Sequence, residues 1–323
     1  MDRLFFSANN NTINKHKFQQ RAVIFLNLRT DLALERHEIA GSSEIDGVIL
    51  KKYKTKTVTV TEIEITNENG EKALDKPKGK YITLDVTPFT RVGDLFSPEL
   101  EVLSSMIRKL LPKSKKSILV VGLGNESITS DALGPLTAQM VFATRHIGSE
   151  LAKSIGFEKL RSVADIIPGV LGKTGIETGE IVESVVKKID PAAVIAVDAL
   201  AARRLERLGT TVQMATSGVS PGSGVGNARS CLDEKHLGVP VLSIGVPTVV
   251  DGATLAFDLI EKAGIKENES LSREMLRPFG EGIMVSPKEI DLMIQRASQF
   301  IAMGINCALQ RSLDPKDILA IVS

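Results

Sequence analysis

The chain of 323 residues is 43% hydrophobic and 24% charged, which is typical of a globular protein long enough for one large domain or two. A formal net charge of +1, no Trp and 4% aromatic residues argue against a nucleic-acid-binding protein, because such a chain offers neither a basic field nor a base-stacking platform. No apolar run approaches the ~20 residues of a membrane span, no long apolar leader follows Met1, and two distant cysteines fit a reducing compartment, so we expect a cytoplasmic protein.

The N-terminal segment differs from the rest of the sequence. Residues 1–31 combine an Asn-rich patch, a basic run and one apolar island, and we expect low order up to about Asn27. Residues 29–36 then offer a capping residue ahead of a possible short helix.

An antiparallel β region is predicted next, within residues 48–86. Between Val48 and Thr66, Val and Ile alternate with Thr and Glu, which is the period of a half-exposed strand pair. A turn is expected at residues 68–71 and a further strand at 81–86. Apolar residues at helical spacing then predict a helix over residues 95–111.

The remaining sequence alternates apolar strands with amphipathic helices. The predicted strands cover residues 118–123, 192–197, 210–215 and 239–247, and the predicted helices cover 131–146, 176–189, 199–208, 252–263 and 287–309. Such alternation is typical of parallel sheets. We therefore predict an α/β fold, a mostly parallel twisted sheet flanked by helices on both faces, with the smaller antiparallel β element packed beside it.

A glycine turn follows the first predicted core strand. Gly122-Leu123-Gly124 suggests a dinucleotide-binding turn, but that fingerprint requires a third glycine at position 127, which is Ser. No GxxxxGK[ST] motif occurs either. Nucleotide binding is therefore disfavoured.

A second glycine loop spans residues 217–227. It contains Gly222, Ser223, Gly224 and Gly226, whose backbone N–H groups could cradle an anion, hold an extended peptide or stabilise an oxyanion. A flexible connection explains these residues equally well. A binding module without catalytic activity therefore stays open as an alternative.

Nucleophilic catalysis finds little support in the sequence. The GxSxG elbow of serine hydrolases is absent, and a Cys–His pair is conceivable only between Cys231 and His236. His146 is expected at the end of the first core helix, where a cation stabilises the helix dipole.

Two acids follow two predicted strands. Asp131 lies at the helix entrance after strand 118–123, and Asp198 directly follows strand 192–197. Each alone is explained as a helix cap. Neighbouring parallel strands would bring both to one edge, where one carboxyl keeps its proton and the pair can activate water against a peptide carbonyl. The same acids could instead hold a metal ion, so a metal-assisted peptidase stays open.

These motifs together resemble those of the spore germination proteases of endospore-forming bacteria. The shared stretches are Gly122–Asn125 with residues 131–135, then residues 168–178, 198–203, 221–227 and 245–251. The resemblance extends from about Arg29 to the C-terminus, and the motifs are far more specific together than singly.

The resemblance implies an endopeptidase that degrades small acid-soluble DNA-binding spore proteins during germination. The family is grouped with aspartic peptidases, is similar in fold to hydrogenase-maturation endopeptidases, and places its two essential aspartates at Asp131 and Asp198. It further implies a homotetramer in the forespore or spore core. We expect no cofactor, no dedicated metal ligands, and no direct contact with nucleic acid or membrane, although the similarity to hydrogenase-maturation endopeptidases keeps a metal-assisted peptidase open.

The resemblance also implies a zymogen that removes its own N-terminal segment. Family substrates are cut after an acidic residue and before a large apolar one, a pattern that Thr30-Asp31-Leu32-Ala33-Leu34-Glu35 fits. We therefore predict cleavage between Asp31 and Leu32, which divides the chain into a propeptide (residues 1–31) and a peptidase domain (residues 32–323). An acidic residue before the cut suggests a basic pocket, for which Arg145, Arg203 and Arg204 are candidates.

Overall fold

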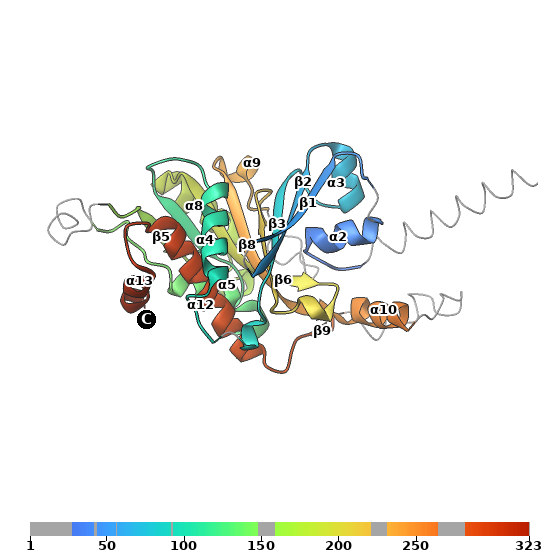
Figure 1. Cartoon of the computed structure of the whole chain (residues 1–323). Helices are drawn as coiled ribbons and strands as arrows, with labels where there is room; N and C mark the ends of the chain where they lie inside the picture. Colours follow the sequence, from blue (N-terminus) through green and yellow to red (C-terminus); the bar gives the residue numbers. More distant parts are fainter. Residues whose placement is uncertain are drawn as a thin grey trace, which may run out of the picture.

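The structure, a computed structural model, describes residues 28–41, 44–55, 57–91, 93–147, 159–220, 231–263 and 282–322 (Figure 1). Its strands are β1 (Val48–Thr55), β2 (Val58–Ile65), β3 (Gly79–Asp85), β4 (Ile118–Gly122), β5 (Val163–Ile166), β6 (Ala193–Ala202), β7 (Thr211–Ala215), β8 (Val241–Asp251) and β9 (Met284–Val285). Its helices are α2 (Ala33–Ala40), α3 (Glu68–Leu74), α4 (Pro98–Leu110), α5 (Leu133–Gln139), α7 (Leu171–Thr174), α8 (Thr178–Ile189), α9 (Glu234–Leu237), α10 (Gly252–Lys262), α12 (Ile290–Leu309) and α13 (Pro315–Val322). Short 3-10 turns form at η1 (Phe89–Arg91), η2 (Thr129–Asp131) and η3 (Leu205–Arg207). Within these ranges, no helix has the length and apolar character needed to cross a bilayer.

The described strands form one mixed sheet in the order β1-β2-β3-β7-β8-β6-β4-β5, with β9 paired to β8. The strands β5, β4, β6 and β8 are parallel neighbours, whereas β1, β2, β3, β7 and β9 make antiparallel pairs. The prediction of a mostly parallel sheet is therefore wrong. The antiparallel region is not a separate element beside the core, because β3 pairs with β7 and so extends the same sheet.

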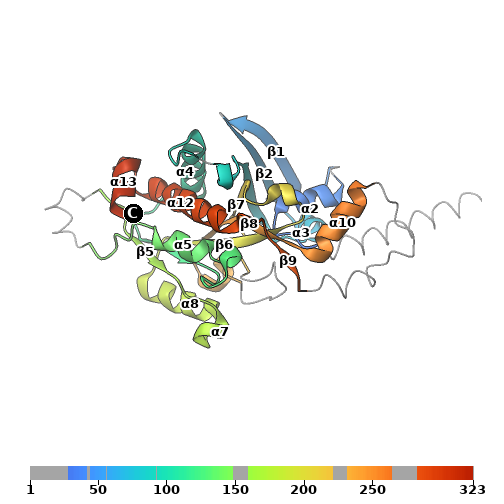
Figure 2. The same cartoon turned by 90° about the horizontal axis from the view of Figure 1, so that it is seen from below.

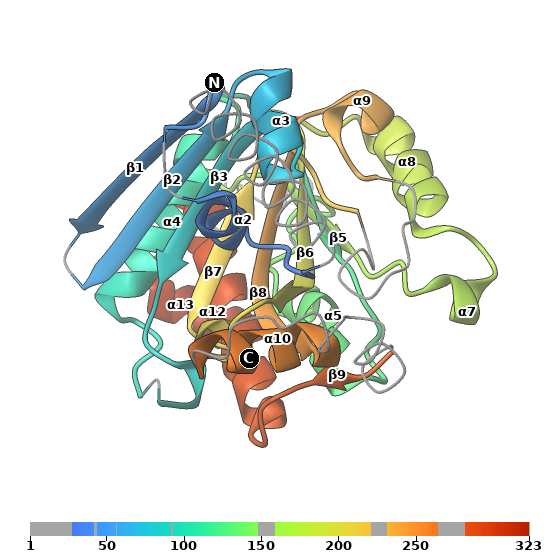
Figure 3. The same cartoon turned by 90° about the vertical axis from the view of Figure 1, so that its right-hand side faces the viewer.

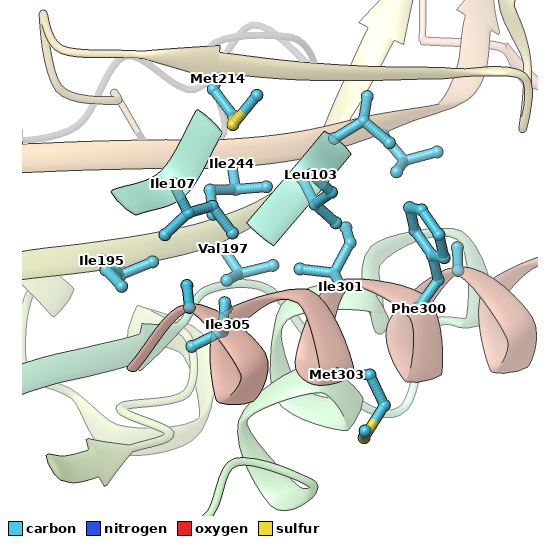
Figure 4. Close-up of a cluster of buried hydrophobic side chains, with 14 of the residues drawn as sticks. Leu103, Ile107, Ile195, Val197, Met214, Ile244, Phe300, Ile301, Met303 and Ile305 are labelled. Atoms are coloured by element: carbon cyan, nitrogen blue, oxygen red, sulfur yellow. The ribbon is translucent and has the colours of Figure 1, made fainter. Parts of the chain in front are cut away.

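One face of the sheet is covered by α4, α5 and α12, which lie on the same side of the strands in Figure 2. Side chains at every second strand position point to this face, as Val212 and Met214 of β7 do. Figure 4 shows Met214 near Ile107 of α4 and, below them, Ile301 and Ile305 of α12. The helix α12 is apolar on most of its surface, and it forms the centre of the largest buried cluster.

The opposite face carries two separate groups of helices: Figure 3 shows α2 and α3 in front of the strands and α8 and α9 to the right of them. The helices α2 and α3 pack over the antiparallel end, in a buried cluster with Ile63, Ile65 and Tyr81. The helices α8 and α9 pack over the parallel part, in a cluster with Leu119 and Val194. Helices therefore flank both faces, as predicted.

The predicted helix over residues 199–208 is wrong. Strand β6 continues to Ala202, and only the short turn η3 follows it. Residues 199–202 are rich in helix-forming Ala and Leu, but their backbone pairs with β8 across a register shift after Leu200. Tertiary pairing has overridden the local propensity.

Other boundaries also differ from the predictions. The first core helix is shorter, because α5 ends at Gln139, so His146 does not end a helix. The expected turn at residues 68–71 is the start of α3, where the Asn67 side chain accepts a hydrogen bond from Gly70 N. The last predicted helix begins at Ile290 rather than at residue 287, and α13 follows it without having been predicted.

Candidate active site

A cavity of about 650 Å³ lies on the second face of the sheet, bounded by Lys76 beyond α3 and by Thr178 at the start of α8. Its floor contains Tyr81 of β3, Gln213 and Ala215 of β7, Ser243 and Gly245 of β8, and Asp198 of β6. These strands are neighbours in the sheet. Several floor residues are small, which leaves room above the strands.

Asp198 lies inside β6 rather than at a strand end as predicted. Its backbone pairs opposite Gly245, and its carboxylate Oδ1 accepts a 2.9 Å hydrogen bond from Ala199 N. Only 7% of the residue is exposed. Burial raises the pKa of Asp198 well above its usual range, the nearby charges of Asp131 and Asp31 raise it further, and the bond from Ala199 N opposes them.

Asp131 is positioned by the glycine turn after β4. Gly124 has a φ of +115°, and a Cβ there would lie 2.1 Å from the Asp131 carbonyl oxygen, so the close approach requires glycine. Asn125 N donates to the Asp131 backbone oxygen at 3.1 Å and to carboxylate Oδ2 at 2.8 Å. Thr248 of β8 donates to Ser130 O at 2.7 Å, which anchors the same turn to the sheet.

Asp131, in the turn η2 that follows β4, and Asp198, within the neighbouring strand β6, therefore line one cavity. Strands β4 and β6 pair in parallel up to Gly122 and Val197, and Leu123 N donates to Val197 O at 2.8 Å. The charge of Asp131 acts on Asp198 across this space. A carboxyl whose pKa is raised, with a second carboxyl lining the same cavity, suits general acid–base chemistry.

The segment that precedes α2 enters this cavity. Asp31 N donates to Ala201 O at 2.8 Å, and Ala201 N donates to Asp31 Oδ2 at 2.8 Å. These Ala201 groups lie beyond the point at which β4 stops pairing with β6. Residue 31 therefore adds to β6 where a neighbouring strand has ended, which is a common way of binding an extended peptide.

The residues after Asp31 are also held firmly. Leu32 is fully buried in a cluster with Ala202 and Val250. The Glu35 carboxylate accepts hydrogen bonds from Arg203 N at 2.7 Å and Arg204 N at 3.0 Å. Burial raises the pKa of Glu35, and these bonds oppose the rise. The predicted processing site, Asp31 and Leu32, is thus bound along the cavity and the sheet beside it.

The three arginines proposed as a basic pocket do not line the cavity in the described part of the chain. Arg145 is exposed, and the guanidinium groups of Arg203 and Arg204 face carboxylates elsewhere. The cavity is instead lined by Lys76, which sequence reasoning missed. Burial lowers the pKa of Lys76, and the charge of Asp31, which lines the same cavity, opposes this effect.

The second glycine loop is described only in part. Its first four residues, Ser217 to Ser220, line the cavity. Gly222, Ser223, Gly224 and Gly226 lie outside the described residues.

The cysteine alternative receives no support from the geometry. Cys231 lines the cavity, but burial raises the pKa of its thiol, the opposite of what an activated nucleophile requires. His236 Nδ1 lies 2.6 Å from Asp233 Oδ1. In the described ranges, no group of three or more His, Cys, Asp or Glu side chains is arranged to hold a metal ion.

The raised pKa of Asp198 predicts a pH-dependent gain in stability from Asp198→Asn. The folded chain holds this proton more tightly than the unfolded chain, so wild-type stability falls as the pH rises from the ordinary Asp value, about 3.9, to the raised one. The Asp198→Asn protein lacks this proton, so its free energy of unfolding should exceed that of the wild type increasingly as the pH rises through this window. The total increase in the difference should be about 1.4 kcal/mol for each unit by which folding raises the pKa. Urea denaturation at a series of pH values measures it, and a difference that stays constant with pH contradicts the expectation.

Comparison with known proteins identifies relatives over most of the chain. A family model described as Germination protease matches residues 29–264 and 258–320. The chain is 43% identical to a protein named Germination protease from Caldanaerobacter subterraneus subsp. tengcongensis, over 92% of this chain and 98% of that protein. It is 42% identical to the Germination protease of Clostridium tetani (91% and 98%) and 36% identical to that of Priestia megaterium (90% and 95%).

Proposed function

The chain belongs to the germination protease family and is a peptidase, and we propose that Asp131 and Asp198 hydrolyse the peptide bond without a resident metal ion. One observation carries the proposal: the two acids line a single cavity into which the chain's own Asp31 extends, ahead of the buried Leu32. The raised pKa of Asp198 supports its role as the protonated partner.

The proposed reaction begins with Asp131 as general base. Its carboxylate takes a proton from a water molecule as the water oxygen bonds to the carbonyl carbon, and the carbonyl oxygen becomes an oxyanion. The tetrahedral intermediate collapses, the C–N bond breaks, and Asp198 gives its proton to the departing nitrogen. A proton then passes from Asp131 to Asp198 and restores the starting state.

We further propose that the chain is a zymogen cut between Asp31 and Leu32, with residues 1–31 as the released segment. The acidic residue before the cut would be recognised by Ala201 N and by the charge of Lys76. The apolar residue after it would occupy the site formed by Ala202 and Val250.

The proposed substrates are small acid-soluble DNA-binding spore proteins, degraded in the spore core during germination. The family name supports a protein substrate in spores. We also propose a homotetramer. The exposed apolar side chains of Ile49, Leu50 and Tyr53 on β1, an end strand of the sheet, support self-association.

Self-processing of the full chain tests this proposal. Incubation of the purified protein should yield a product whose N-terminal residue is Leu32. Replacing Asp31→Asn should slow the cut about 10-fold or more, because the amide removes the negative charge that acts on Lys76 in the same cavity. Timed electrophoresis with N-terminal sequencing measures both results.

The exposed α13 residue Asp317 supplies the matched control, because Asp317→Asn changes the same chemistry away from the cavity and should process at the wild-type rate. A new N-terminus other than Leu32, or unchanged processing of the Asp31→Asn protein, contradicts the assigned site. A chelator tests the metal-free mechanism. If the chelator abolishes activity and one divalent ion restores it, the mechanism is metal-assisted.

A further inference from the structure

The side chain of Gln213 spans the bond between Asp31 and Leu32. Its Nε2 donates to Asp31 O at 2.9 Å, and its Oε1 accepts from Ala33 N at 2.7 Å. Asp31 O is the carbonyl oxygen of the bond at which processing is proposed. The amide of Gln213 therefore contacts the chain on both sides of this bond.

The orientation of the Gln213 amide follows from its partners. Ala33 N can only donate, so it faces Oε1, and Asp31 O can only accept, so it faces the amino group. Gln213 is 6% exposed and lies on β7, where it pairs with Thr83 of β3 and Gly245 of β8. A strand paired on both sides holds the donor in a fixed position at the cavity floor.

We propose that Gln213 is a catalytic residue that stabilises the oxyanion during peptide hydrolysis. This inference rests on the proposed function, because it takes Asp31 O as the reacting carbonyl oxygen. As the water oxygen bonds to the carbonyl carbon, the π electron pair moves onto Asp31 O, and the Nε2–H of Gln213 donates to the negative charge that forms there. When the C–N bond breaks, that pair returns to the C=O bond and the nitrogen of Leu32 leaves with the proton from Asp198.

The second contact of Gln213 sets the register of the chain. By accepting from Ala33 N, Oε1 holds the residue two positions after the cut carbonyl. Both groups that Gln213 binds are backbone groups, so any extended peptide can present them regardless of its side chains. The proposal therefore extends from the chain's own segment to its protein substrates.

The test uses two replacements of similar size in the full-length protein. Gln213→Glu puts a carboxylate oxygen where the donor was, and Gln213→Met removes both hydrogen bonds without adding charge. Each variant is assayed for Asp31–Leu32 self-cleavage and, after any processing, on a fluorogenic peptide with the sequence of residues 27–38. Both should lower the self-cleavage rate and the kcat on the peptide about 10²- to 10³-fold, with a smaller change in KM, because the donor acts most strongly on the charged intermediate.

Three further measurements separate this role from a structural one. Gln295→Ala, on an exposed position of α12, should retain the wild-type kcat. The activity of Gln213→Glu relative to Gln213→Met should rise as the pH falls, since a protonated Glu regains a donor. Circular dichroism and the midpoint of thermal unfolding identify any variant that fails to fold, in which case the other variant decides.

Folded Gln213 variants with a kcat within about threefold of the wild type overturn the proposal, because the loss of an oxyanion donor costs far more. The Asp198→Asn protein is assayed in parallel. If it still cleaves, the proposed function fails. If the Asp198→Asn protein is inactive while the Gln213 variants are active, the proposed roles of the two aspartates are retained and only the proposed role of Gln213 is refuted.

Discussion

Replacing Asp198 with Asn is expected to lower the rates of self-processing and of peptide cleavage by about 10³-fold or more, because the amide cannot give a proton to the departing nitrogen. The substitution preserves the shape of the side chain, and an Asn Oδ1 can still accept the hydrogen bond from Ala199 N. The fold should therefore survive. The rate of appearance of the Leu32 N-terminus and the kcat on the fluorogenic peptide measure the loss.

The matched control is Asp190→Asn, because Asp190 is exposed on the surface and has a φ of +45°, a conformation that Asn also adopts. This variant should retain wild-type rates. Asp131→Asn should be as inactive as Asp198→Asn, and the double variant should lose little more, since two residues that act in one reaction are not additive. Cleavage that persists in both single variants would refute the roles assigned to the two acids.

Replacing Gly134 with Ala is expected to destabilise the protein by about 3 kcal/mol. A Cβ at Gly134, at the start of α5, would lie 2.2 Å from Leu123 O and 2.4 Å from Val197 O. Both are backbone atoms, and Leu123 N is hydrogen-bonded to Val197 O, so neither can move away without separating β4 from β6. Urea denaturation should show the loss as a lower midpoint.

Gly172→Ala supplies the control for this substitution. Gly172 lies in α7, and a Cβ there would meet no atom within 4 Å. Because Ala favours a helix over Gly by about 1 kcal/mol, this variant should be as stable as the wild type or slightly more so. Equal stability of Gly134→Ala and the wild type would contradict the close contact at the β4–β6 junction. Reduced activity is also expected of Gly134→Ala, since the same junction positions both acids.

Local patterns predicted the glycine turn and most of the strands, but not β5 or β9. Strand β4 and the first half of β6 were recognisable as short apolar runs. Asp131 and Asp198 were recognisable because each follows such a run. The direction of the strands was not predictable in the same way. Strand β7 has the composition of a buried parallel strand, yet it pairs antiparallel with both β3 and β8. Strand direction depends on where the chain travels between strands, which apolar periodicity does not record.

The other groups at the cavity could not be found from sequence. Lys76 lies in a polar turn after α3, and Gln213 is one polar residue in an apolar strand. Neither belongs to a motif, and Gln213 is 182 positions from the Asp31 oxygen it contacts. Only the pairing of β3, β7, β8 and β6 brings these residues together on one face. The prediction of a basic pocket of arginines was wrong for a similar reason. The sequence near Asp198 does not indicate which side chains face the cavity.

The docking of residues 31 to 35 has a further consequence for how the uncut chain meets other proteins. Asp31 occupies the free edge of β6 and Leu32 fills an apolar site beside it, so the cavity already contains a peptide that cannot diffuse away. A tethered ligand acts at an effective concentration in the millimolar range. Any protein arriving from outside competes with that concentration at the same hydrogen-bonding groups. Before the proposed cut, the chain therefore resembles an enzyme with a tethered competitive inhibitor, whose occupancy depends on the ratio of this effective concentration to its dissociation constant.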